Sequence, residues 1–250
     1  MTLAIVAALQ EELAAGLDLL PEERKTTVAG REFWVGHLHG HEVVAVLSRV
    51  GKVAAATTAT LLIERFGVRG IVFTGVAGGL GDGVRVGDVV VAQQFAQHDM
   101  DASPLFPRHE VPLYGLTRFA TDGALSDALA AAAQAMLADA PRTLGADTLR
   151  EFALQQPRLH RGLVLSGDRF VATAAESAAL RRDWPDALAV EMEGAAIAQV
   201  CFDAGVPFAA VRTISDRADD AAHVDFVRFI RAVASRYSVA LVDAWLRSRR

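Results

Sequence analysis

The chain has almost no cysteine: Cys201 is the single thiol among its 250 residues. A disulfide within the chain is therefore excluded, and this scarcity is typical of proteins from a reducing compartment. The cysteine and the histidines do not have the spacing of a zinc site, so we expect no metal centre. We predict a cytoplasmic protein.

An excess of positive charge is also absent. Lys and Arg total 25 against 30 Asp and Glu, a net charge of −5, which gives no electrostatic reason to expect nucleic acid or an acidic membrane as a partner. No apolar run is long enough to cross a bilayer, and the first residues turn acidic too early for a signal peptide. With 52% hydrophobic residues, the chain instead predicts a globular protein with a sizeable core.

Short apolar segments alternate with helical ones along the chain. We predict strands at 3–8, 31–38, 42–48, 86–93, 161–166, 187–191 and 207–214, and another leading into the glycines at 75–79. Predicted helices begin at Gln10 and cover 51–66, 124–140, 174–183, 192–204 and 222–247; residues 141–160 show no clear pattern. This alternation predicts a single α/β domain over residues 1–250, with three αβα layers around a mixed, largely parallel sheet.

Acidic side chains follow three of the predicted strands: Glu12, the pair Glu191 and Glu193, and Asp216. Acidic residues are common at helix starts, where the helix dipole favours them. In open α/β sheets, however, ligands bind beyond the carboxyl ends of the strands, and these carboxylates would meet there. Like charges brought together raise each other's pKa, so the pattern indicates a catalytic site.

The other candidate motifs are weaker. Gly75 to Gly79 predicts a turn whose backbone N–H groups face a ligand, but neither a dinucleotide fingerprint nor a P-loop is present. Ser166 lacks the flanking glycines of a nucleophile elbow. His37, His39 and His41 alternate around a predicted hairpin, which favours an exposed turn over a metal site.

Eight short segments follow one another along the chain: AALQEE, SRVGKVAAA, FTGVAGGL, VGDVVVA, HDMD, LSGDRFV, AVEMEGAAIA and VRTISD. Together they resemble bacterial 5′-methylthioadenosine/S-adenosylhomocysteine nucleosidases of the purine nucleoside phosphorylase-like superfamily. The resemblance covers nearly the whole chain and is weakest from about 101 to 160. It implies hydrolysis of the N-glycosidic bond of a 5′-thioadenosine nucleoside, no cofactor, a homodimer and a place in methionine salvage.

The resemblance also implies the catalytic roles. Glu12 matches the carboxylate that activates the attacking water, and Glu193 matches the one that binds the ribose hydroxyls. Asp216 matches the group that protonates adenine N7, while Arg212 and Ser215 match polar residues that support the water and Asp216. The chemistry agrees, because departure of adenine leaves an oxocarbenium-like sugar that nearby carboxylates stabilise, and the base leaves poorly unless an acid protonates it.

Apolar residues of the same resemblance would hold the substrate. Met192 packs on the sugar, Phe170 stacks on the purine, and the Val171 backbone reads the base edge. The wall around the 5′-thio group is formed by Leu9, Val50 and Phe226.

One apolar loop is expected to serve a neighbouring copy. The proline-rich segment 103–118 contains Phe106, and in the resembling enzymes a loop from the second subunit closes the 5′-thio pocket. The alternative is a lid that folds onto its own subunit. We therefore predict a symmetric dimer with this segment in its interface.

Two departures from the family pattern keep alternatives open. Val76 stands where these enzymes often carry a serine beside the attacking water, and Arg49 replaces a glycine close to the 5′ pocket. A phosphorolytic enzyme is one alternative, with Arg49 as its phosphate-binding cation. A hydrolase of another nucleoside, such as futalosine, and a non-catalytic nucleoside-binding module are the others.

Overall fold

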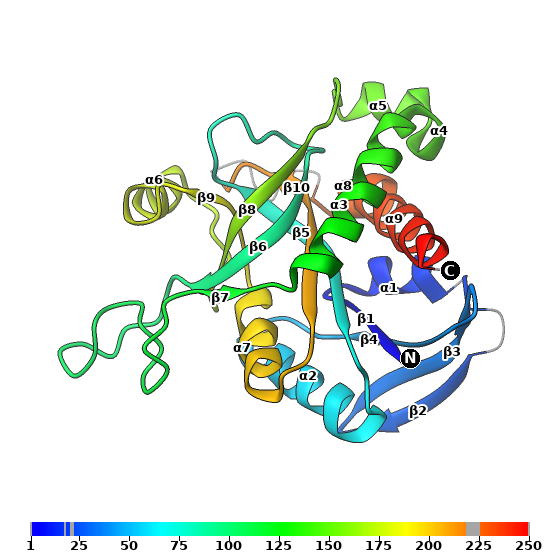
Figure 1. Ribbon diagram of the computed structural model, residues 1–250. Helices are drawn as coiled ribbons and strands as arrows, with labels where there is room; N and C mark the ends of the chain where they lie inside the picture. Colours follow the sequence, from blue (N-terminus) through cyan, green and yellow to red (C-terminus); the bar gives the residue numbers. More distant parts are fainter. Residues whose placement is uncertain (1, 18, 21–22, 219–225, 250) are drawn as a thin grey trace.

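A mixed sheet forms the centre of the computed structural model, which describes residues 2–17, 19–20, 23–218 and 226–249 (Figure 1). Its strands are β1 (Leu3–Ala7), β2 (Arg24–Val28), β3 (Arg31–Leu38), β4 (His41–Leu47), β5 (Ile71–Gly79), β6 (Val89–Gln97), β7 (Phe119–Ala120), β8 (Leu159–Ser166), β9 (Ala187–Glu191) and β10 (Phe208–Asp216). The helices are α1 (Gln10–Leu17), α2 (Lys52–Phe66), α3 (Gly123–Ala138), α4 (Ala140–Leu144), α5 (Ala146–Glu151), α6 (Ala174–Asp183), α7 (Gly194–Ala204), α8 (Phe226–Phe229), the π-helix η1 (Ile230–Ala234) and α9 (Ser235–Ser248).

Half of the sheet closes on itself. β10 pairs with both β5 and β6, and the order β10–β6–β8–β9–β5 returns to β10, so these five strands form a ring. β1, β4, β3 and β2 extend the sheet from β5 in that order. The predicted α/β class with a mixed sheet is confirmed. Antiparallel pairs are as numerous as parallel ones among the described residues, five of each.

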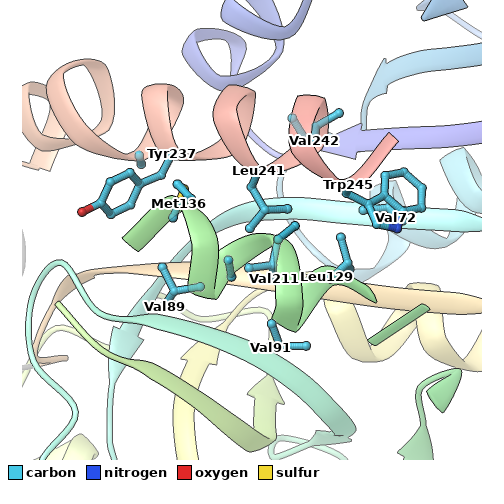
Figure 2. Close-up of a cluster of buried hydrophobic side chains, with 14 of the residues drawn as sticks. Val72, Val89, Val91, Leu129, Met136, Val211, Tyr237, Leu241, Val242 and Trp245 are labelled. Atoms are coloured by element: carbon cyan, nitrogen blue, oxygen red, sulfur yellow. The ribbon is translucent and has the colours of Figure 1, made fainter. Parts of the chain in front are cut away.

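Helices cover both faces of the sheet because alternate strand residues point to opposite sides. On one face, α3 and α9 pack over Val72, Val89, Val91 and Val211 (Figure 2). Trp245 of α9 is fully buried there. The opposite face is covered by α2 and α7, which pack on residues of alternate parity such as Phe73 and Ala210. The three predicted layers are therefore present.

The expected turn at Gly75 to Gly79 is wrong, since β5 continues through Gly79. A methyl carbon placed on Gly75 would lie 2.9 Å from Nη1 of Arg212, and one on Gly78 would lie 2.9 Å from Oδ1 of Asp216. The glycines thus allow side chains of β10 to lie directly against the β5 backbone.

Several boundaries differ from the sequence-based expectation. Strand β2, which pairs with β3 at the sheet edge, was not predicted, and residues 141–160 contain the two short helices α4 and α5. The predicted last helix is divided into α8, η1 and α9, and its residues 222–225 lie outside the described residues. The predicted hairpin at His39–Gly40 is present, with positive φ at both residues as a two-residue turn of this kind requires.

The segment between β6 and β7 projects away from the helices and the sheet (green in Figure 1). Leu105 and Leu113, both on this segment, are 85% and 92% exposed. Among the described helices, none combines the length and the apolar character needed to cross a membrane.

Candidate active site

A pocket of about 170 Å³ opens where β1, β4, β8, β9 and β10 end. Its lining comes from segments far apart in the chain because the parallel strands bring their carboxyl ends together. These residues are Ala8, Leu9, Val50, Val76, Ala77, Gly78, Arg169, Phe170, Val171, Val190, Glu191, Met192, Glu193, Ser215, Asp216 and Phe226.

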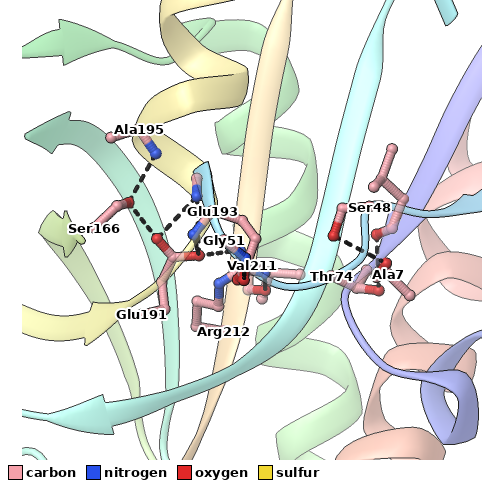
Figure 3. A network of polar contacts seen from close by, with 12 residues as sticks. Ala7, Ser48, Gly51, Thr74, Ser166, Glu191, Glu193, Ala195, Val211 and Arg212 are labelled. Carbon is pink, nitrogen blue, oxygen red and sulfur yellow. Dashed lines mark hydrogen bonds and ion pairs between the residues drawn. The ribbon is translucent and has the colours of Figure 1, made fainter. Parts of the chain in front are cut away.

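Glu191 and Glu193 face different partners although they are two residues apart (Figure 3). Glu191 accepts hydrogen bonds from the backbone N–H groups of Glu193 (3.1 Å) and Gly194 (2.9 Å) at the start of α7, and from the hydroxyl of Ser166. Glu193 instead accepts the N–H of Gly51 at 2.8 Å. Glu191 therefore anchors α7, and Glu193 lies at the pocket surface. Burial and the like charge of Glu191 raise the pKa of Glu193.

Arg212 supplies a buried positive charge beside the pocket. It is 1% exposed, its Nη2 lies 2.8 Å from Oε2 of Glu191, and its guanidinium stacks 3.7 Å from the ring centroid of Phe73. Its Nη1 lies against Gly75 and donates to the carbonyl of Val211 at 3.4 Å, while its Nε has no partner among the described residues. The guanidinium therefore keeps an unused donor at Nε.

Glu12 approaches the same glycine from α1. Glu12 is 3% exposed. Its Oε2 accepts the N–H of Leu9 at 3.3 Å, and its Oε1 is buried without a partner in the part of the chain that the structure describes. Burial raises the pKa of Glu12 to about 7, and the charge of Arg212 opposes this rise. Glu12 is thus poised to exchange a proton near neutral pH.

Asp216 ends β10 on the opposite side of the pocket. Its Oδ2 accepts the hydroxyl of Ser215 at 2.8 Å, and its Oδ1 accepts the N–H of Ala218 at 2.7 Å. These contacts fix the orientation of the carboxylate, which lines the pocket.

Most of the residues predicted from the sequence meet at this site. The pocket lining includes every one of the predicted substrate-binding residues except Phe106, and also Glu193 and Asp216. Glu12 and Arg212 do not line the pocket; both approach Gly75, the residue before Val76 of the pocket lining. Phe106 lies on the projecting segment. Arg49 does not line the pocket, because its guanidinium turns to the carbonyl of Gly30.

Sequence reasoning missed a second group of polar residues at the site. Lys52 donates from Nζ to Asp99 (2.6 Å) and Gln97 (3.0 Å), and its backbone N–H donates to Asp168 (2.7 Å). Asp99 in turn accepts the N–H of Asp168 at 2.8 Å. This network joins the start of α2 to the loop that carries Phe170. The bonded residues are 45 to 116 positions apart, so no local motif could have indicated this network.

The described residues contain no group of three or more His, Cys, Asp or Glu side chains arranged to hold a metal ion. Ser166, which the sequence did not favour as a nucleophile, is buried; it donates to Glu191 and accepts the N–H of Ala195 at 2.8 Å.

Known proteins are similar to this chain over nearly its whole length. The family described as the phosphorylase superfamily matches residues 2–247. The 5′-methylthioadenosine/S-adenosylhomocysteine nucleosidase from Neisseria meningitidis, in complex with methylthio-immucillin-A, is 33% identical, with a TM-score of 0.86 over 99% of both chains. The nucleosidase of the same kind from Streptococcus pneumoniae, with a transition-state inhibitor, is 32% identical, with a TM-score of 0.84 over 100% of both chains. Futalosine hydrolase of Helicobacter pylori is 30% identical, with a TM-score of 0.83 over 99% of this chain and 98% of that chain.

Proposed function

The chain belongs to the phosphorylase superfamily, and we propose that it is a nucleosidase that hydrolyses the N-glycosidic bond of 5′-methylthioadenosine and S-adenosylhomocysteine. The products are adenine and the 5′-thio-ribose. We further propose that the whole chain acts as one catalytic domain in the cytoplasm and serves methionine salvage.

One observation carries this proposal: a buried carboxylate oxygen of Glu12 lacks a partner beside Gly75, where the guanidinium of Arg212 also lies. Oε1 of Glu12 is buried without a partner among the described residues, and both Oε1 and Nη1 of Arg212 approach Gly75. Buried polar atoms are normally satisfied, often by water. A water held there would accept a hydrogen bond from Arg212 and donate one to Glu12, which is the arrangement that a hydrolytic nucleophile needs.

The reaction then divides between the carboxylates. Glu12 takes a proton from the water as the water oxygen attacks the anomeric carbon. Glu193 accepts hydrogen bonds from the ribose hydroxyls and, when it is ionised, stabilises the positive charge that develops on the sugar. Asp216 delivers a proton to N7, so that adenine leaves as a neutral base. Phe170 and Met192 hold the base and the sugar between these groups.

Water is a better nucleophile for this site than phosphate. A phosphate dianion needs several cationic or N–H donors. Arg212 is already paired with Glu191, and Arg169 at the pocket mouth is paired with Glu176. Arg49, the cation that the phosphorolytic alternative required, is directed to Gly30 instead.

A nucleoside panel tests the reaction. We expect adenine to be released from 5′-methylthioadenosine at the same rate with and without inorganic phosphate, and in the presence of a chelator. The products are identified by chromatography. A requirement for phosphate, with formation of a sugar 1-phosphate, contradicts hydrolysis. Preferential cleavage of futalosine would instead identify futalosine as the substrate.

We also propose that the enzyme is a symmetric homodimer whose interface includes the segment 103–118. Apolar side chains are exposed on this segment, at the start of α2 and near the end of α7. Tyr114 contacts Phe202 with ring centroids 6.2 Å apart, which links the segment to α7. An exposed apolar surface of this kind usually marks an interface. Its exposed members are Val53 (79%), Leu105 (85%), Leu113 (92%) and Phe202 (57%).

The shared pocket is tested with Phe106→Asp. We expect this charge to weaken dimerisation in sedimentation velocity and to raise KM for 5′-alkylthio substrates at the same time, because Phe106 would close the pocket of the second subunit. Ala131→Asp, on the exposed side of α3, is the matched control. A wild-type enzyme that is monomeric and fully active at the assay concentration contradicts this arrangement.

A further inference from the structure

A second pocket lies behind the wall at the 5′ end of the proposed nucleoside site. It has a volume of about 250 Å³, and its lining includes Gln10, Arg31, Glu32, Trp34 and Arg49. Leu9 and Val50 line the first pocket, and their sequence neighbours Gln10 and Arg49 line the second. The two pockets therefore share a wall.

Arg31 gives this second pocket a positive charge that no carboxylate in the described part of the chain neutralises. The guanidinium is buried, and its acceptors are all uncharged: the hydroxyl of Thr58 (2.8 Å) and the carbonyls of Ala29 (3.2 Å) and Ala54 (3.3 Å). Burial and the neighbouring charge of Arg49 lower the pKa of Arg31. A buried cation among neutral partners is costly unless an anion compensates it.

Arg49 adds a second cation at the exposed edge of the pocket. Its guanidinium donates to the carbonyl of Gly30 and, among the described residues, pairs with no carboxylate. The backbone of Arg49 has a φ of +63°, a conformation that favours glycine. An arginine kept in such a conformation beside a pocket indicates a functional use for its side chain. Glu32 also lines the pocket, but Lys25 lies 2.8 Å from its carboxylate and offsets its charge.

We propose that Arg49 and Arg31 form a subsite for an anionic group, a carboxylate, at the far end of the 5′ substituent. This inference rests on the proposed function, in which the 5′-thio group lies against Leu9 and Val50. A substituent longer than methyl continues over that wall and places its terminal group between Gln10 and the two arginines. Arg49 then makes a charge-assisted hydrogen bond with the carboxylate, while the indole of Trp34 contacts the alkyl chain.

The test compares two nucleosides of equal chain length, 5′-(3-carboxypropylthio)-5′-deoxyadenosine and 5′-butylthio-5′-deoxyadenosine. The quantity measured is the ratio of their kcat/KM values. In Arg49→Gly we expect this ratio to fall about tenfold relative to the wild type, mainly through KM, because the contact lies far from the reacting atoms. Glycine suits the positive φ, so the variant is expected to fold, which a thermal melt checks.

Two further variants test whether the ratio responds to charge in the pocket in the expected direction. Glu32→Gln removes a carboxylate from the pocket and should raise the ratio. Arg69→Gln, an exposed position just before the amino end of β5, removes an equal charge and should leave the ratio unchanged. An unchanged ratio in Arg49→Gly overturns the subsite and leaves the nucleosidase intact. Cleavage of neither substrate by the wild type overturns the proposed function and the subsite with it.

Discussion

Replacing Glu12 by Gln is expected to lower kcat by about 10²–10⁴-fold while nucleoside binding changes little. The amide oxygen can still accept the N–H of Leu9, so the position of the side chain is retained. The amide cannot take a proton from water, so the attacking nucleophile is not generated. Turnover is measured by adenine release, and binding by calorimetry with a non-hydrolysable 5′-thio analogue.

The pH profile of the same variant gives a second readout. Because the pKa of Glu12 is raised to about 7, the free wild-type enzyme should gain kcat/KM as pH rises through that value, where the carboxylate loses its proton. This rising limb should be absent from Glu12→Gln. The neighbouring Glu11→Gln breaks a contact with Arg231 and removes a charge that raises the pKa of Glu12. This control should therefore keep the rate and the rising limb, with the limb moved to slightly lower pH. A variant at position 12 with a rate within a few-fold of wild type would assign water activation to another residue.

Asp216→Asn is expected to be the other severe substitution, again with a loss of about 10²–10⁴-fold in kcat on adenine nucleosides. The asparagine oxygen can accept the N–H of Ala218, and its amide can donate to Ser215, so the local structure is kept. The asparagine amide cannot donate a proton to adenine N7, so the acid catalysis by Asp216 is lost. A riboside with a nitrophenolate leaving group needs no such proton and should retain most of its rate.

The comparison of the two leaving groups separates acid catalysis from misplacement of the side chain. A general-acid role predicts a large loss on the adenine substrate and a small one on the nitrophenyl riboside. Losses of equal size on both would remove Asp216 from that role. Asp127→Asn, which breaks a surface contact with Arg161, serves as the folding control.

The sequence predicted that the carboxylates at the ends of the apolar strands share one site. Glu193 and Asp216 follow apolar strands, and parallel strands place their carboxyl ends on one edge, so a shared pocket could be expected without coordinates. The apolar lining, including Phe170 and Phe226, came from the family resemblance rather than from any local pattern. Phe170 and Phe226 line the pocket, and the roles assigned to them and to the carboxylates stay predictions.

What the sequence did not predict depends on contacts between distant segments. The glycines at Gly75 and Gly78 resembled a turn because their reason for being glycine, the side chains of Arg212 and Asp216, lies on a strand more than 130 residues away. The different partners of Glu191 and Glu193 are set by α7 and by Gly51 respectively. Spacing alone cannot distinguish two carboxylates separated by one residue.

The ring of strands also has a consequence for local opening. Each of its five strands has a hydrogen-bonded neighbour on both sides, so none is a free edge that can separate alone. Val211, Arg212 and Thr213 of β10 pair with β5 on one side and with β6 on the other, so the protein must break two ladders to expose this part of the strand. Their amide protons should therefore exchange among the slowest in the molecule, while β2 at the sheet edge exchanges early. The carboxylate of Asp216, at the end of the same strand, would then keep its position between turnovers without any closing movement of that strand.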